Sequence, residues 1–179
     1  MKKMCIVLIG PPCSGKSTIG RTTANNIGAR YISSGDIARK MAENDNGVKT
    51  DLSNGKLAPE NMMRDQIYRA LYDAYDTADI VILDGFPRFG DQAKWLRETL
   101  PMRVDIRYVC IHASEEVVMI RSLERNRMDD KSISDRYEYY KNTTLHDLYT
   151  YINKIIPSVN TIEYCCNKLK NYIMEEYRC

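Results

Sequence analysis

The sequence predicts an α/β fold in which a five-stranded parallel sheet carries helices on both faces. Short, continuously apolar runs alternate along the chain with amphipathic helical stretches, and a glycine-rich loop follows the first run. The clearest runs are MCIVLI (4–9), DIVILD (79–84) and IRYVCIH (106–112). Because a strand covered on both faces needs no polar alternation, such runs are typical of parallel strands in a layered domain.

The other elements have weaker but readable signals. Two further strand candidates are ARYIS (29–33) and SVNTIE (158–163). Helices are indicated by apolar residues that recur on one face and by polar or proline residues that suit a first turn. The predicted helices are a stretch after the glycine-rich loop, 59–76 beginning at Pro59, one capped by Ser114, a long one from Ser132 or Ser134 to about Lys154, and 164–177.

Composition bounds the class of protein. The 179 residues show no repeat, linker or low-complexity tract, so they predict one domain over residues 1–179. Lys and Arg number 26 against 24 Asp and Glu, a net charge of only +2, which argues against a protein held to nucleic acid by bulk electrostatics. We expect a monomer that binds small molecules.

The chain shows no targeting or membrane signal that withstands inspection. No run approaches the roughly 18–20 apolar residues that span a bilayer. The start, MKKMCIVLIGPPCSGKS, imitates a signal peptide but runs straight into the glycine-rich loop, so we interpret it as a strand. The six cysteines lack zinc-type spacing and predict reduced thiols, which favours a cytoplasmic location without a membrane partner.

The glycine-rich loop is the strongest local motif. GPPCSGKST (10–18) matches G-x-x-x-x-G-K-[ST] with an apolar run before it and a helical stretch after it. Glycine lets backbone N–H groups turn inward around a phosphate, and the helix that follows offers its positive end. This predicts a three-layer fold of the P-loop NTPase type. The predicted ATP-binding residues of the loop are Gly10, Pro12, Cys13, Ser14, Gly15, Lys16, Ser17 and Thr18.

Asp84 supplies a second part of a nucleotide site. It ends the buried run VILD, where an aspartate beside a phosphate loop can hold Mg²⁺ directly or through water, together with Ser17. The alternative is that Asp84 only caps the following turn. Loop and aspartate together predict NTP hydrolysis or phosphoryl transfer with Mg²⁺ and ATP, but they do not name the acceptor.

Segments in matching order resemble the adenylate kinase family of nucleoside monophosphate kinases, in its short-lid form. Besides the phosphate loop, the segments are ISSGDIAR (32–39), NGKLAPE (54–60), LDGFPRFGDQA (83–93), RNRMDD (125–130) and RYEYYKNTTLHDLYTYI (136–152). The resemblance implies transfer of the γ-phosphoryl of ATP to a nucleoside monophosphate. It also implies a helical insertion that binds the monophosphate at about 34–64, and a very short lid at about 125–134.

The resemblance assigns roles to scattered cations. Two phosphate tails that meet head to head repel each other, so guanidinium groups must approach from several directions. By resemblance, Arg39 and Arg88 hold the α-phosphate of the acceptor and Arg121 lies against the base of the donor. Arg125 belongs to the ATP site as well as to the catalytic set. The implied catalytic residues are Lys16, Arg88, Arg125, Arg127 and Arg136.

The acceptor base is indicated by Gln92. The family places glutamine there where adenine is recognised, so Gln92 with Ser34 favours AMP. The full set implied for the monophosphate is Ser34, Gly35, Arg39, Lys56, Leu57, Ala58, Gly85, Phe86, Arg88, Gln92, Arg127 and Arg136.

Alternatives remain for the function and for the basic stretch RSLERNRMDD (121–130). The stretch is typical of a solvated helix end or of a nucleic-acid surface as well as of a phosphate clamp. For the whole chain, the alternatives are a kinase for dAMP, CMP, UMP or another monophosphate, a small-metabolite kinase on a similar core, and a nucleotide-binding protein that has lost turnover.

The short lid generates a first prediction. Only Asn126 separates Arg125 from Arg127, where the family's short-lid members usually carry several residues more. Such a stub cannot fold far over the donor, so water is excluded incompletely. We expect a wasteful ATPase in the presence of the acceptor, measured as free phosphate. ADP formed in strict pairs, with no excess phosphate, would contradict this prediction.

Overall fold

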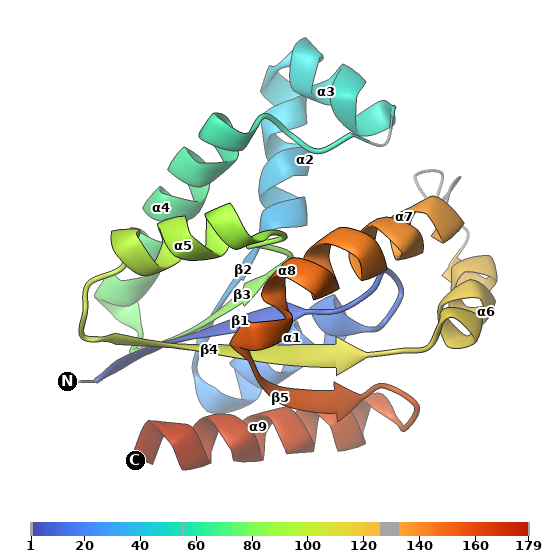
Figure 1. Cartoon of the computed structure of the whole chain (residues 1–179). Helices are drawn as coiled ribbons and strands as arrows, with labels where there is room; N and C mark the ends of the chain where they lie inside the picture. The colour runs from blue at the N-terminus through green and yellow to red at the C-terminus, as the bar shows by residue number, and fades with distance from the viewer. Residues whose placement is uncertain (1, 55, 126–132, 179) are drawn as a thin grey trace.

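The computed structural model describes residues 2–54, 56–125 and 133–178, and within them a single parallel sheet organises the molecule (Figure 1). The strand order is β2-β3-β1-β4-β5, so the two strands that border the phosphate loop and Asp84 are neighbours. This confirms the α/β fold with a five-stranded parallel sheet. The strands are β1 (Lys3–Ile9), β2 (Arg30–Ser33), β3 (Ile80–Asp84), β4 (Val104–His112) and β5 (Ile152–Pro157).

Helices cover both faces of the sheet, and Figure 1 shows α1 and α9 on one face and α4, α5 and α8 on the other. Within the described part, residues 140–145 (η2) form a π-helical segment and residues 149–151 (η3) a 3₁₀ turn. The α-helices are α1 (Lys16–Ile27), α2 (Ser34–Asn44), α3 (Asn46–Ser53), α4 (Glu60–Thr77), α5 (Gly90–Thr99), α6 (Glu115–Arg125), α7 (Ile133–Tyr139), α8 (His146–Leu148) and α9 (Ile162–Arg178).

Strand β1 shows why the apolar runs have no polar alternation. Its residues Cys5, Val7 and Ile9 belong to the core under α4 and α5, whereas Met4 and Ile6 belong to the core under α1 and α9. Successive side chains of a strand point to opposite faces, so a strand covered on both faces must be apolar throughout. The prediction drawn from this pattern is correct for β1, β3 and β4.

The fifth strand is not where the sequence predicted it. The prediction placed it at 158–163, but β5 is Ile152–Pro157 and the predicted long helix ends at Tyr151 instead of about Lys154. Residues 153–155 are exposed at the edge of the sheet, so the strand tolerates polar residues and lacks the expected apolar run. Residues 158–161 form the loop that leads into α9.

Helix α1 lies unusually close to the sheet at Gly20. A Cβ at this position would lie 2.6 Å from Leu8 Cδ1 and 2.9 Å from Tyr31 Cε2. The missing side chain therefore brings the helix that follows the phosphate loop directly onto β1 and the Tyr31 ring.

Parallel pairing brings the functional segments to one edge. Leu8 of β1 pairs with Asp84 of β3, so the phosphate loop and the end of VILD emerge together. In open parallel sheets, ligands bind outside the carboxyl ends of the strands. Among the described residues, no helix is both long and apolar enough to cross a bilayer.

The core between the sheet and helices α1 and α9 can be tested by truncating one of its buried side chains. Leu169 of α9 is completely buried between the sheet and α1, so Leu169→Ala should lower the free energy of unfolding by about 2–5 kcal/mol. Leu123→Ala is the matched control, because the Leu123 side chain is 83% exposed and its truncation should cost within about 0.5 kcal/mol. Urea denaturation of both variants makes the comparison, and equal losses would contradict the assignment of this core.

Candidate active site

The phosphate loop joins β1 to α1 in a conformation that requires glycine. Gly10 and Gly15 have φ values of 149° and 86°, and a Cβ at Gly10 would collide with the carbonyl oxygen of Ile111 on β4. Cys13 also adopts a positive φ, 55°, which is uncommon for a residue with a side chain. The loop ends at the first turn of α1, whose N–H groups and dipole favour an anion.

The side chain of Lys16 folds back onto earlier residues of the phosphate loop. Its Nζ donates to the carbonyl oxygen of Pro11 at 2.7 Å and lies 3.5 Å from Ser14 Oγ. Burial lowers the pKa of Lys16, and the nearby carboxylate of Asp84 opposes that shift. The ammonium group is held at the phosphate loop, where the negative charge of a bound phosphate would offset its desolvation.

Asp84, at the end of β3, accepts hydrogen bonds from two hydroxyl groups. Its Oδ2 accepts from Ser17 Oγ at 2.6 Å and from Tyr31 OH at 2.7 Å, and the residue is buried. Burial, with Asp84 as the second cause, raises the pKa of Tyr31, so the phenol stays a hydrogen-bond donor. A carboxylate and a hydroxyl beside a phosphate loop offer oxygen ligands of the kind that Mg²⁺ prefers.

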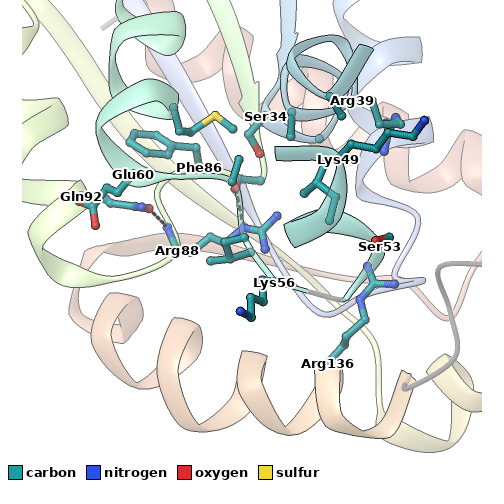
Figure 2. Close-up of a pocket in the computed structure, with 18 of the residues that line it drawn as sticks. Ser34, Arg39, Lys49, Ser53, Lys56, Glu60, Phe86, Arg88, Gln92 and Arg136 are labelled. Atoms are coloured by element: carbon teal, nitrogen blue, oxygen red, sulfur yellow. Dashed lines mark hydrogen bonds between the residues drawn. The ribbon is translucent and has the colours of Figure 1, made fainter. Parts of the chain in front are cut away.

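A cavity of about 890 Å³ opens between helices α2, α3 and α4 and the loop after β3, and we call it the acceptor cavity after the role that the sequence predicts for its residues (Figure 2). Every residue predicted for the monophosphate and located in the described part of the chain lines it. Gln92 lies at one end of this acceptor cavity, with Arg39 and Lys49 toward the other. The predicted residues in its lining are Ser34, Gly35, Arg39, Lys56, Leu57, Ala58, Gly85, Phe86, Arg88, Gln92 and Arg136.

Two polar side chains at the acceptor cavity keep hydrogen-bonding capacity that the protein does not use. Gln92 is buried, and its Oε1 accepts the backbone N–H of Arg88 at 2.8 Å, so the amide NH₂ is left to donate elsewhere. The Ser34 hydroxyl is buried and has no hydrogen-bond partner among the described residues. A buried polar group of this kind is satisfied at low cost when a ligand supplies the partner.

A second cavity, of about 590 Å³, adjoins the phosphate loop and shares Arg88 and Arg136 with the first. Lys16, Gly10 and Pro12 line this donor-side cavity. Arg88 Nε donates to the carbonyl oxygen of Gly85 at 3.1 Å, and burial lowers the pKa of Arg88. The two cavities therefore meet at Arg88, which is half-buried in the loop after β3, and at Arg136, which is exposed on α7, while the half-buried Lys16 of α1 lines only the donor-side cavity.

Of three further predicted arginines, one lies elsewhere and two fall at or beyond the limit of the described residues. Arg121 of α6 lines neither cavity and instead donates to Ser158 at the end of β5. Arg125 ends α6, and its side chain is not described, while Arg127 falls in 126–132, outside the described residues. Arg39 lines the acceptor cavity while paired with Asp36 at 2.6 Å.

Sequence reasoning missed several residues of the site. Lys49, Ser53 and Glu60 line the acceptor cavity and Tyr139 lines the donor-side cavity. Lys49 and Ser53 belong to α3, a short helix of mostly polar residues that resembles any solvated surface helix. The alternation of side chains along β2 indicates which face of the sheet Tyr31 occupies. Only the parallel pairing of β2 with β3 reveals that its partner is Asp84.

Comparison with known proteins identifies the family of the chain. The family model described as adenylate kinase matches residues 8–156. Adenylate kinase 1 of Nostoc sp. is 34% identical over 84% of this chain and 87% of its own length. The adenylate kinase of Mycobacterium leprae is 34% identical, and that of Mycobacterium tuberculosis 35% identical, each over 89% of this chain and 93% of its own. The chain belongs to the adenylate kinase family.

Proposed function

We propose that the protein transfers the γ-phosphoryl group of ATP to AMP and releases two ADP. One observation carries the proposal: Arg88 and Arg136 line both the acceptor cavity and the donor-side cavity, and Lys16 lines the donor-side cavity beside them. The names of the related proteins support the same activity. The phosphate loop binds the triphosphate, and the acceptor cavity binds the monophosphate.

Catalysis rests on position and charge. The acceptor is already an ionised phosphate, so no general base has to remove a proton before attack. Lys16 holds the donor phosphates, while Arg88 and Arg136 lie where the two phosphate tails meet. Because these cations are held before the reaction, they stabilise the charge on the transferring group without reorganising.

The acceptor is selected by the end of the cavity that carries Gln92. Its carbonyl oxygen is bound to the backbone of Arg88, so its NH₂ donates to an acceptor nitrogen of the base. Ser34 supplies a second, unsatisfied hydroxyl at the same cavity. Arg39 and Arg88 bind the α-phosphate, while Arg125 and Arg127 complete the clamp on the transferring group.

Mg²⁺ fits beside the phosphate loop. Asp84 Oδ2 and Ser17 Oγ lie 2.6 Å apart and form a compact pair of oxygen ligands, and Mg²⁺ commonly uses one or two carboxylates with phosphates and water. The ion would neutralise phosphate charge and orient the donor. Tyr31 fixes the carboxylate from the other side. We further propose a cytoplasmic monomer.

Substitution of Arg88 separates an enzyme from a binding protein. Arg88→Ala should lower kcat by about 10³-fold, because removal of a clamping arginine from phosphoryl transfer costs roughly that much. A binding protein without turnover would change only its affinity for the monophosphate. Arg103→Ala is the control, because Arg103 is exposed before β4, at the opposite ends of the strands, and its coupled-assay rate should match the unmodified protein.

The acceptor base is tested by a panel of AMP, dAMP, CMP, UMP, GMP and dTMP with ATP and Mg²⁺. AMP or dAMP should give the highest kcat/KM. Gln92→Ala should lower kcat/KM for AMP on the order of tenfold, because one buried hydrogen bond to the base is lost. Rates for CMP or UMP above those for both adenine nucleotides would overturn the role of Gln92 and favour the alternative acceptors.

A further inference from the structure

Ser158 connects three segments of the chain that are far apart in sequence. Its Oγ donates to the carbonyl oxygen of Ser14 in the phosphate loop at 2.6 Å and accepts from Arg121 NH1 at 2.9 Å. Its carbonyl oxygen accepts from Arg121 NH2 at 2.5 Å, and its N–H donates to His112 on β4 at 2.7 Å. The residue is 1% exposed.

The bond to Ser14 fixes the orientation of one peptide in the phosphate loop. The carbonyl of Ser14 points to Ser158 Oγ, with Arg121 NH1 also within 3.5 Å. In a trans peptide the N–H of the next residue points to the opposite side from the carbonyl. The N–H of Gly15, directly before α1, therefore points away from Ser158 and is held in one direction.

The same residue fixes the plane of the Arg121 guanidinium. NH1 and NH2 donate to the two oxygens of Ser158, and such bonds lie in the guanidinium plane. In-plane bonds leave the flat faces of the group for stacking, which is how a guanidinium contacts an aromatic base. Ser158 thereby fixes the orientation of the Arg121 guanidinium, which lines neither cavity.

We propose that Ser158 is a positioning residue for the phosphoryl donor, an adenine nucleoside triphosphate, and that it acts through Arg121 and the Ser14–Gly15 peptide. The inference rests on the proposed function, since it assumes that the donor lies along the phosphate loop. The backbone of Ser158 is held by His112, so loss of the hydroxyl leaves the residue in place. Ser158 lines neither cavity, but its hydroxyl bonds to Ser14 of the phosphate loop and to Arg121, so only the donor side should respond.

Ser158→Ala is the direct test, with steady-state kinetics and calorimetric titration of ATP. The KM and the dissociation constant for ATP should rise about tenfold. The reason is that the buried carbonyl of Ser14 and the guanidinium of Arg121 both lose the Ser158 hydroxyl as a hydrogen-bond partner. The KM for AMP should stay within about twofold, a split that general loosening of the fold would not produce. Unchanged ATP affinity would overturn the inference.

Thr161→Ala is the matched control from the same loop. It also removes one hydroxyl, which accepts the N–H of Tyr164 at the start of α9 at 3.2 Å. We expect a small loss of thermal stability from the weakened cap and unchanged ATP affinity. An increase in the dissociation constant for ATP equal to that of Ser158→Ala would show that the loop acts as a whole and would contradict a specific role for Ser158.

A double variant tests whether Ser158 works through Arg121. The factor by which Ser158→Ala weakens ATP binding should be smaller in an Arg121→Ala background, because one of its two targets is already gone. Equal factors in both backgrounds would overturn the coupling. If the unmodified protein transfers no phosphoryl group to AMP, the proposed function fails separately, whereas the calorimetric comparison still tests Ser158.

Discussion

Repulsion between two phosphate tails is the constraint on which the rest of this structure depends. Like charges repel strongly outside water, so a site that joins two nucleotides head to head must supply cations from more than one direction. A parallel sheet does this naturally, because the carboxyl ends of its strands meet at one edge. Here the phosphate loop after β1 delivers Lys16 at the start of α1, the loop after β3 delivers Arg88, and α7 brings Arg136 to the same place.

Burial makes Lys16 and Arg88 effective and also makes them costly. Lys16 and Arg88 both have pKa values lowered by burial, which means that the protein alone favours their charged forms less than water does. A phosphate that enters the site restores the balance, so the cost of desolvation turns into affinity for an anion. The carboxylate of Asp84 offsets part of this cost for Lys16.

The sequence revealed those parts of the molecule whose physics is local. The buried strand β1, the glycine positions of the phosphate loop and the run that ends at Asp84 each follow from a few adjacent residues. Residues of the acceptor cavity were found by resemblance, and the cavity gathers those that the structure describes. Most of the lid predicted at about 125–134 falls on 126–132, which lie outside the described residues.

The sequence-based prediction was wrong where tertiary contacts decide which residues form a strand. Strand β5 lies at the edge of the sheet and carries exposed polar residues, so no apolar run marked it. The displaced prediction hid the loop at 158–161, and with it Ser158, whose partners Ser14 and Arg121 are 144 and 37 residues away in the chain. Distances of that kind cannot be read from spacing in a single sequence.

The close approach of α1 to the sheet at Gly20 has a wider consequence. Any side chain there would push on Leu8 or on the ring of Tyr31, and Tyr31 in turn holds the carboxylate of Asp84. Residue 20, which lines neither cavity, thus bears on the ring whose hydroxyl donates to that acid. A substitution at residue 20 should therefore disturb the acid through the Tyr31 ring, without contacting Asp84 directly.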